Sequence, residues 1–281
     1  MYGFWVLILL IVLFVRVPHR DLQITFIDVD QGDGILIEMP SGAVCLIDGG
    51  SSSIEDVGSR RMESALKYRG IYEIDFAFVS HTDSDHISGL LELMQESGAG
   101  SIRIRHLCIP MFEENENQAL LLSAAKDKGI PVTFLSAGMS FAFEEVKLSC
   151  LHPFSGKDYP DANAASCVLS LTYGEFSALF TGDLGQEGEQ ELLKHFSSLD
   201  HDLLKVGHHG SRESSSAAFL KGVSPQLAVI SAGVHNRYGH PHKETTERLE
   251  ACGSRIYVTA ESGEILVHVD RQGAVSVRTM F

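Results

Sequence analysis

The chain has 281 residues, of which 44% are hydrophobic, so it can form one large domain or two small ones with a real core. Its formal net charge of −15 argues against broad electrostatic binding to nucleic acid, although a bound metal ion can reverse the local field. Its five cysteines lack C-x-x-C spacing, which argues against a zinc ribbon or a disulfide framework.

The first segment, MYGFWVLILLIVLFVRVP, carries no charge before Arg16. Its apolar run is shorter than the ~20 residues that cross a bilayer comfortably. It lacks the basic start and small-residue cleavage site of a signal peptide. We expect residues 1–20 to anchor the protein in the cell membrane as a single-pass helix, with a buried apolar helix as the alternative. By the positive-inside rule, Arg16 and Arg20 favour a cytoplasmic position for the rest of the chain.

The remainder, residues 21–281, reads as one domain of short strands and helices. Apolar alternation between turns predicts strands over 22–30, 35–39, 43–50, 74–80, 102–109, 132–135, 146–151, 166–173, 176–181, 201–207, 226–231, 255–259 and 264–269. Helices are expected over 56–69, 86–97, 116–128, 186–196, 214–221 and 243–251. Strands dominate both halves and helices follow groups of strands, so we expect a mixed α/β fold, an αββα sandwich.

The stretch HTDSDH places four metal-binding side chains, His81, Asp83, Asp85 and His86, within six residues. It follows an apolar strand and precedes a helix, so all four side chains can converge from one loop on about two metal positions. Imidazole suits zinc, iron and manganese, and carboxylates suit harder ions. A solvated loop would not need this density of ligands, and the stretch therefore predicts metal binding.

HTDSDH resembles the HxHxDH signature of metallo-β-lactamase-fold hydrolases, with Asp83 in place of the middle histidine. The HxDxDH variant resembles the hydrolase domain of the ComEC competence family. The stretches FIDVDQGDGILIE, LIDGG, NAASCVLSL, LFTGDLG, LLKVGHHGSRES and YGHP resemble it too, over about residues 22–270. The resemblance implies a membrane-bound, metal-dependent hydrolase that uses two divalent ions.

By this resemblance, Asp183 of TGD bridges the two ions, since each carboxylate oxygen can hold one. The first site would use His81, Asp83 and Asp183, with Asn163 roughly where a third histidine is usual. The second would use Asp85, His86, Asp183 and either His209 or His208. We favour His209 as the ligand and His208 as a substrate or second-sphere contact. The oxygen-rich first site shifts the preference from zinc towards manganese or magnesium.

Other residues receive roles around this centre. Asp33 and Asp48 are expected to shape the metal site by contacting the ligands rather than the metal, with plain turn residues as the alternative. Asp30 replaces the usual glycine of DVGQGD, a position that asparagine and aspartate tolerate if φ is positive. His240 is a candidate for contact with phosphate or the leaving group, with a buried hydrogen-bonded histidine as the alternative. Ser211 belongs to GSRESSS, which offers either an anion site or an ordinary helix cap.

The chemistry that we expect is hydrolysis of a phosphodiester by a metal-activated water, with Asp83 or Asp85 orienting the water and His208 and His240 also catalytic. The resemblance implies a nuclease acting on single-stranded DNA during uptake, an extracytoplasmic catalytic domain, and a channel formed by another chain. A small, wall-linked or lipid phosphodiester is the first alternative substrate. The second alternative is a non-catalytic module that binds a metal or ligand, motivated by the substituted histidines. No GxSxG or P-loop motif supports a competing mechanism.

Overall fold

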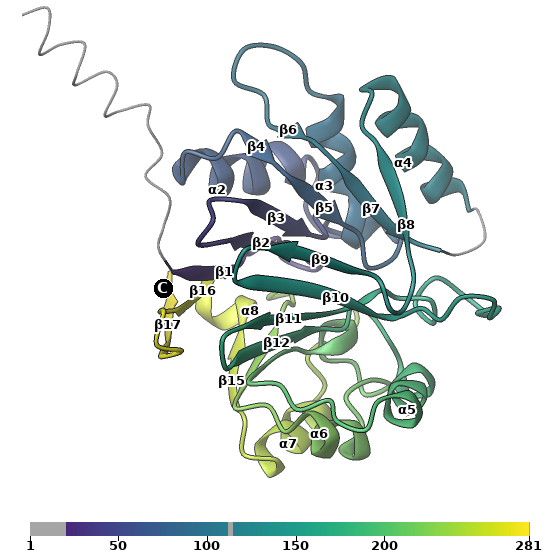
Figure 1. The fold of residues 1–281 in the computed structure, drawn as a ribbon, viewed down its shortest axis with the longest axis vertical. Coiled ribbons are helices and arrows are strands. Elements are labelled where there is room, and N and C mark those ends of the chain that lie inside the picture. Colours follow the sequence, from purple (N-terminus) through teal and green to yellow (C-terminus); the bar gives the residue numbers. More distant parts are fainter. Residues whose placement is uncertain (1–20, 112–114, 281) are drawn as a thin grey trace, which may run out of the picture.

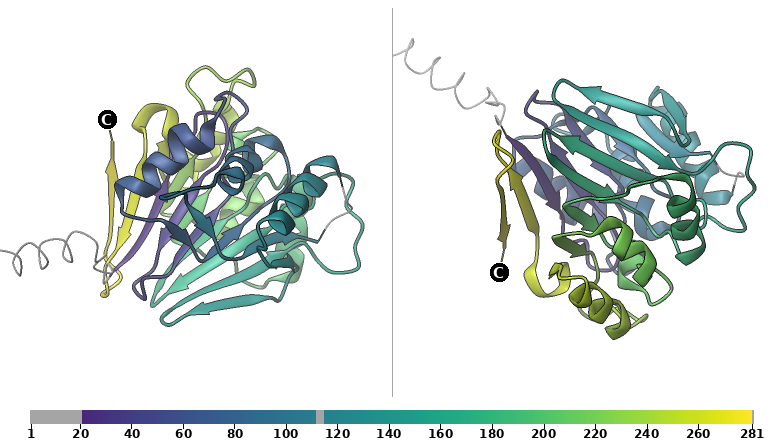
Figure 2. Two further views of the ribbon diagram at one scale, coloured as in Figure 1. Left: turned by 90° about the horizontal axis from the view of Figure 1, so that it is seen from above. Right: turned by 60° about the horizontal axis from the view of Figure 1, so that its bottom comes forward.

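The computed structural model describes residues 21–111 and 115–280, which form four layers (Figure 1). Two β-sheets pack face to face, and helices cover the outer face of each, as two further views also show (Figure 2). The sequence predicts this αββα order. The membrane helix expected over residues 1–20 lies outside the described residues, and within these no helix combines the length and apolar character needed to cross a bilayer.

The first sheet has eight strands in the order β17-β16-β1-β2-β3-β5-β7-β8. Neighbours from β17 to β3 pair antiparallel, and neighbours from β3 to β8 pair parallel. The strands are β1 Leu22–Phe26, β2 Ile35–Glu38, β3 Val44–Ile47, β5 Phe76–Phe78, β7 Leu107–Pro110, β8 Val132–Leu135, β16 Ile265–Val269 and β17 Val275–Thr279. The beginning and end of the domain meet here, since Leu22 pairs with Val269.

The second sheet has seven strands in the order β15-β14-β13-β12-β11-β10-β9. Neighbours from β9 to β12 pair antiparallel, and neighbours from β12 to β15 pair parallel. The strands are β9 Ser140–Phe143, β10 Val146–His152, β11 Val168–Tyr173, β12 Phe176–Phe180, β13 Leu203–Lys205, β14 Leu227–Ile230 and β15 Arg255–Val258. A separate parallel pair consists of β4 Glu73–Ile74 and β6 Arg103–Ile104.

The helices divide between the two outer layers (Figure 1). Against the first sheet pack α2 Glu63–Tyr68, α3 Ser84–Gln95 and α4 Glu116–Asp127, and against the second pack α5 Gln186–His195, α6 Ala217–Val223 and α7 Lys243–Ala251. Shorter elements are a π-helical turn Gly58–Met62, a 3-10 turn Gly207–Gly210 and α8 Thr259–Ser262. Strand residues alternate between the layers: Ile35 and Ile37 join the core between the sheets, whereas Leu36 joins the core beneath the helices.

The structure differs from the predicted elements where the sequence pattern is weak. Strands β9 and β17 are not predicted, and β17 lies at a sheet edge with mostly exposed side chains, so it has no apolar face to reveal it. The strand expected over 102–109 is interrupted between β6 and β7. The helix expected over 214–221 begins at Ala217, because the Ser216 hydroxyl accepts a hydrogen bond from the Phe219 N–H and caps it.

Candidate metal centre

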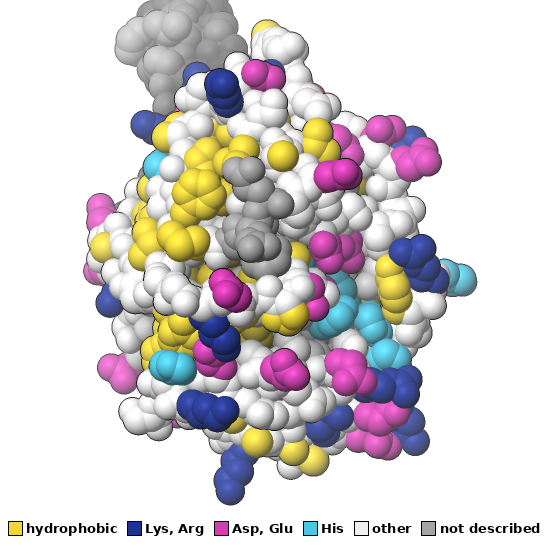
Figure 3. Space-filling model, turned by 90° about the vertical axis from the view of Figure 1, so that its right-hand side faces the viewer, with side chains coloured by type: hydrophobic (Ala, Val, Ile, Leu, Met, Phe, Trp, Pro, Cys, Tyr) yellow, Lys and Arg dark blue, Asp and Glu magenta, His cyan; other side chains and the backbone are white. Residues whose placement is uncertain are grey.

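The residues that the sequence singles out lie where parallel strands end. Strands β3 and β5 run parallel and lead to Asp48 and His81, while β12 and β13 run parallel and lead to Asp183 and His209. The carboxyl ends of neighbouring parallel strands meet at one edge of a sheet, so these side chains come together. On the surface, several histidine side chains gather in one patch (Figure 3).

Two glycine-containing loops hold the start of α3 in place. The Asp33 N–H donates to the Asp85 carbonyl oxygen at 3.0 Å, and the Gly49 N–H donates to the His86 carbonyl oxygen at 2.7 Å. A Cβ on Gly50 would lie 2.6 Å from the Asp85 carbonyl carbon, so only glycine permits this approach. The QGDG and IDGG motifs therefore do more than turn the chain, because they position the first turn of α3.

A buried group of donor atoms surrounds Asp183. The His86 Nε2 lies 3.4 Å from its Oδ1, and the His209 Nε2 lies 3.5 Å from its Oδ2 and equally far from Asp85 Oδ2. Neither of these Nε2 atoms nor Asp183 Oδ1 has a hydrogen-bond partner among the described residues. Ligands held about 2.1 Å from one ion are separated by roughly 3–3.5 Å, so the residues fit a divalent cation.

A second group shares the same aspartate. The His81 Nε2, also buried and without a hydrogen-bond partner among the described residues, lies 4.0 Å from Asp183 Oδ2 and 3.7 Å from Asp83 Oδ2. The His208 Nε2 lies 3.8 Å from the same Asp183 oxygen. Asp83 and His208 are partly exposed, so this group lies on the solvent side. The two groups therefore meet at Asp183, whose Oδ2 lies near His81, His208 and His209 and whose Oδ1 lies near His86.

Hydrogen bonds from the ring nitrogens that face away from Asp183 orient two of the buried histidines. The His86 Nδ1–H donates to Asp48 Oδ2 at 3.0 Å, and the His209 Nδ1–H donates to the Ser231 carbonyl oxygen at 2.9 Å. These bonds leave each Nε2 free as an acceptor, which is the arrangement of metal-bound histidine. The other Asp48 oxygen accepts a hydrogen bond from the Ser80 N–H at 2.7 Å.

Four of the non-glycine residues with positive φ border this centre: Asp30, Asp48, His208 and His209. Residues held in this sparsely populated region cluster at functional sites. For Asp30 the structure answers a question that the sequence raises, because its φ of 62° is in the left-handed region where the related motif has glycine.

Lys205 is the residue that sequence reasoning missed. Its side chain is 1% exposed, and its ammonium group contacts Asp33 Oδ2, donates to the Gly182 carbonyl oxygen at 3.1 Å and lies 3.8 Å from Asp183 Oδ1. A lysine inside the otherwise apolar run LLKVG was the available signal. Buried lysine almost always has a charged partner, and here the partner is Asp33.

Asp33 lies behind the ligands rather than among them. Although one of its oxygens falls within 4.8 Å of donor atoms of His86, Asp183 and His209, its short contacts are to the Nδ1 atoms of His86 at 3.6 Å and His209 at 4.0 Å. Those nitrogens face away from Asp183, towards which the Nε2 atoms point. The supporting role expected for Asp33 stays a prediction, and its carboxylate forms an ion pair with the Lys205 ammonium group.

Electrostatics keep the carboxylates of the centre ionised. Burial would raise the pKa of Asp183, but His209 and His86 hold it well below its usual value. Burial would also raise the pKa of Asp85, but the neighbouring His209 and His86 lower it to about 2. In return, Asp183 and Asp48 raise the pKa of His86 well above its ordinary value, despite the burial that lowers it. A divalent cation would compete with these histidine protons.

The groups at the solvent side behave differently. Burial and the neighbouring Asp85 raise the pKa of Asp83. Burial, followed by His209 and His208, lowers the pKa of His240 to about 4, so this ring is neutral at pH 7. The centres of the His240 and His208 rings are 5.9 Å apart, and the His240 Nδ1 has no hydrogen-bond partner among the described residues. His240 therefore lies beside the rings of His208 and His209, next to the centre.

The roles expected for Asn163 and Ser211 stay predictions. The buried Oδ1 of Asn163 has no hydrogen-bond partner among the described residues, and the Asn163 carbonyl oxygen accepts a hydrogen bond from the Ser166 N–H at 3.0 Å. The Ser166 hydroxyl, in turn, accepts from the Asp183 N–H at 3.3 Å. The Ser211 hydroxyl accepts a hydrogen bond from the Glu213 N–H at 3.3 Å, so it closes a turn.

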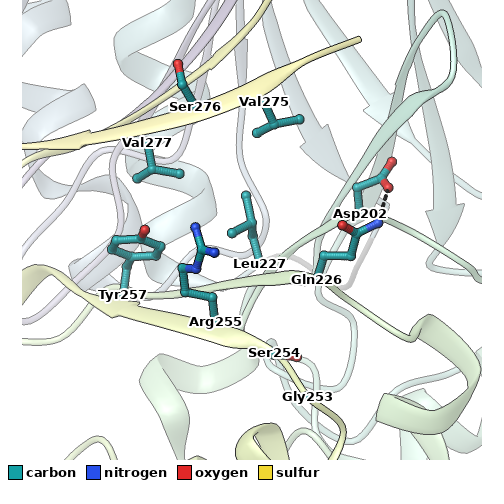
Figure 4. Close-up of a pocket in the computed structure, with 10 residues that line it drawn as sticks. All are labelled: Asp202, Gln226, Leu227, Gly253, Ser254, Arg255, Tyr257, Val275, Ser276 and Val277. Carbon is teal, nitrogen blue, oxygen red and sulfur yellow. Dashed lines mark hydrogen bonds between the residues drawn. The ribbon is translucent and has the colours of Figure 1, made fainter.

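A separate hollow of about 600 Å³ lies between strands β15 and β17, at the far edges of the two sheets (Figure 4). Its lining includes Arg255, Tyr257 and Val277, and Gln226 donates a hydrogen bond to Asp202 at its rim. None of the residues that line it belongs to the group at Asp183.

Comparisons with known proteins cover most of this chain. The family model of the metallo-beta-lactamase superfamily matches residues 27–235. ComE operon protein 3 of Bacillus subtilis is 30% identical over 270 residues, covering 91% of this chain, and competence protein ComA of Neisseria gonorrhoeae is 30% identical over 263 residues, covering 93%. The chain spans 34% of the length of each of these curated relatives.

The fold is also similar to a solved structure. The metallo-beta-lactamase fold protein YhfI from Bacillus subtilis covers 92% of this chain with a TM-score of 0.58 and 14% sequence identity, and all of that protein is matched. At this identity the likeness concerns the fold alone.

Proposed function

The chain belongs to the metallo-beta-lactamase superfamily, and from that premise we propose that it is a metal-dependent phosphodiesterase of nuclease type. One observation carries the proposal: buried nitrogen and oxygen atoms of His81, His86, Asp183 and His209 converge without hydrogen-bond partners among the described residues. Leaving such atoms unpaired is costly unless a ligand satisfies them. The donor set suits two divalent ions, with His86 and His209 favouring zinc and the oxygen-rich set at His81 favouring manganese or magnesium.

Bound ions would activate water and neutralise charge on the attacked phosphate. The chain's own residues complete the site. Asp83, whose side chain is half-exposed, would orient a water molecule and accept its proton, and its raised pKa suits that exchange. Asp85 is ionised and lies 3.5 Å from His209, which suits a ligand better than a proton acceptor. His208 and the neutral His240 lie beside each other near the centre, where they can contact the phosphate or the leaving group.

A phosphodiester is the substrate class that we favour, because its transition state gathers negative charge that such a centre can hold. Two relatives carry names that refer to competence, which supports single-stranded DNA taken up by the cell as the substrate. A small, wall-linked or lipid phosphodiester fits the same chemistry. The substituted histidine positions, with Asp83 and Asn163 where the resemblance leads us to expect histidines, support a second candidate, a module that binds a metal or ligand without turnover.

We further propose that residues 1–20 anchor the chain in the cell membrane as a single helix, with residues 21–281 as the hydrolase domain. A separate membrane channel protein would then pass DNA to it. The competence relatives support an extracytoplasmic domain, whereas Arg16 and Arg20 favour the opposite side. Labelling of an introduced single cysteine in intact cells with a membrane-impermeant reagent would decide between the two orientations.

The test begins with elemental analysis of the purified full chain, followed by hydrolysis of methyl p-nitrophenyl phosphate with added manganese or zinc. We expect two ions per chain and activity that Asp183→Ala abolishes. Lys243→Met, at an exposed ion pair on α7, is the matched control and should keep both. Tight metal without turnover of any phosphodiester would favour the binding module. A chain that binds no metal and hydrolyses no phosphodiester would contradict the phosphodiesterase and leave a module that binds another ligand.

A further inference from the structure

The loop between β14 and α7 builds a ladder of flat groups that leads out of the centre. The His209 and His240 rings are 6.4 Å apart and 28° from parallel, and the His240 and Tyr238 rings are 5.5 Å apart and 19° from parallel. The Arg237 guanidinium carbon lies 4.8 Å from the centre of the Tyr238 ring. The ladder therefore runs from a buried residue of the metal centre to solvent.

The loop is held in this shape by its own hydrogen bonds. The Asn236 amide donates to the Gly233 carbonyl oxygen at 2.8 Å and to the His240 carbonyl oxygen at 2.6 Å, and accepts from the His240 N–H at 2.8 Å. Arg237 donates to the Tyr238 hydroxyl at 2.6 Å. The ladder is thus organised before any ligand arrives, which reduces the entropy lost on binding.

The fold does not need the outer part of this ladder. Tyr238 is 43% exposed and belongs to none of the three hydrophobic cores of the described residues. The contacts that the structure records for Arg237 within the described part of the chain are both with Tyr238, so no carboxylate there neutralises its charge. In a chain of net charge −15, a half-exposed aromatic ring and a guanidinium group without a recorded carboxylate partner therefore lie together, stacked outward from His240.

We propose that Tyr238 and Arg237 form a subsite that stacks a nucleobase of a phosphodiester bound at the metal centre. Single-stranded nucleic acid and nucleoside phosphodiesters expose a flat base one sugar away from the phosphate, and proteins bind such bases on aromatic rings and guanidinium planes. Arg237 also offers charge to the neighbouring phosphates. The inference rests on the proposed phosphodiesterase function, and it separates nucleic acid from lipid or wall-linked phosphodiesters, which carry no base.

The test compares two substrates with the same leaving group, thymidine 5′-p-nitrophenyl phosphate and methyl p-nitrophenyl phosphate. The readout is the ratio of their kcat/KM values, for the full-length wild type, Tyr238→Ala, Tyr238→Phe and Arg237→Ala. We expect Tyr238→Ala to lower the ratio about 5- to 150-fold, the range that loss of one stacked base gives, and Tyr238→Phe to keep it. Val234→Ala, at an exposed apolar residue of the same loop, should leave the ratio unchanged.

Equal losses on both substrates, or an unchanged ratio in Tyr238→Ala, would overturn the stacking subsite while leaving the phosphodiesterase intact. If the wild type hydrolyses neither substrate, the proposed function fails, and binding then decides the subsite. Fluorescence anisotropy in EDTA would compare a labelled single-stranded oligonucleotide with an abasic strand of equal length. We expect Tyr238→Ala to weaken binding of the first strand only, and equal binding of both strands by the wild type would refute the subsite.

Discussion

Replacing Lys205 by methionine tests whether the metal centre depends on a buried charge pair. Methionine keeps an unbranched side chain but leaves the carboxylate of Asp33, 0% exposed, without its ammonium partner. Breaking a buried ion pair on one side costs about 3–5 kcal/mol. His86 and His209 lie 3.6 and 4.0 Å from Asp33 and can compensate in part, so we expect a loss of about 3 kcal/mol in the free energy of unfolding.

The assay is urea and thermal unfolding of the chain in EDTA, followed by circular dichroism. For a domain of this size, 3 kcal/mol corresponds to a fall in Tm of roughly 6–12 °C. Lys243→Met removes the exposed pair with Glu247 and should cost about 0.5 kcal/mol or less. The double variant Lys205→Met with Asp33→Asn removes both buried charges and should recover at least half of the lost stability.

Two results would refute this reasoning. If Lys205→Met is no less stable than Lys243→Met, Asp33 does not need the ammonium group. If the double variant is as unstable as Lys205→Met alone, the loss comes from packing rather than from an unpaired charge.

Three further predictions follow from the same structure. Asp183→Asn should lower the metal content from two ions per chain to one or none, measured by elemental analysis, because the bridging carboxylate loses its charge. Burial lowers the pKa of His201, whose ring is hydrogen-bonded to Ser170, so the unfolded chain takes up the proton before the folded chain as the pH falls below about 6.5. The free energy of unfolding should therefore be highest above that pH and decrease below it. His201→Asn should reduce this pH dependence. Gly50→Ala should lower the free energy of unfolding, measured by chemical denaturation, by about 1–3 kcal/mol and weaken metal binding, because its Cβ would collide with the backbone of α3. Gly185→Ala is the control: the atom nearest its Cβ would be 3.6 Å away, so this substitution should be tolerated.

The sequence predicts those residues of the centre that a short segment identifies. His81 and His86 are identified by their spacing after an apolar strand, and Asp183 by its position at the end of another strand. Each signal fixes where the chain leaves a sheet, and parallel pairing then brings these points together. The four-layer order is also predictable, because short segments of the sequence show the apolar alternation and the grouping of strands.

What the sequence does not predict depends on contacts between distant segments. Lys205 and Asp33 are far apart in the chain, and neither segment alone shows that the lysine is buried. The turn that joins Asn163 to Ser166 is a second example, because the Ser166 hydroxyl accepts a hydrogen bond from the distant Asp183 N–H. Strand β17 has mostly exposed side chains, so only its pairing with β16 defines it.

The pairing of β1 with β16 also constrains how the protein is made. Leu22 is among the first described residues to leave the ribosome, yet its partner Val269 follows 247 residues later. At about 5–20 residues per second, synthesis of the intervening chain takes roughly 12–49 s. Throughout that interval the edge of β1 opposite β2 is unpaired, which is the condition under which strands join the wrong partner. The nascent chain is therefore most exposed to aggregation just before its last sheet strands emerge, and a chaperone that binds apolar strands would be most useful then.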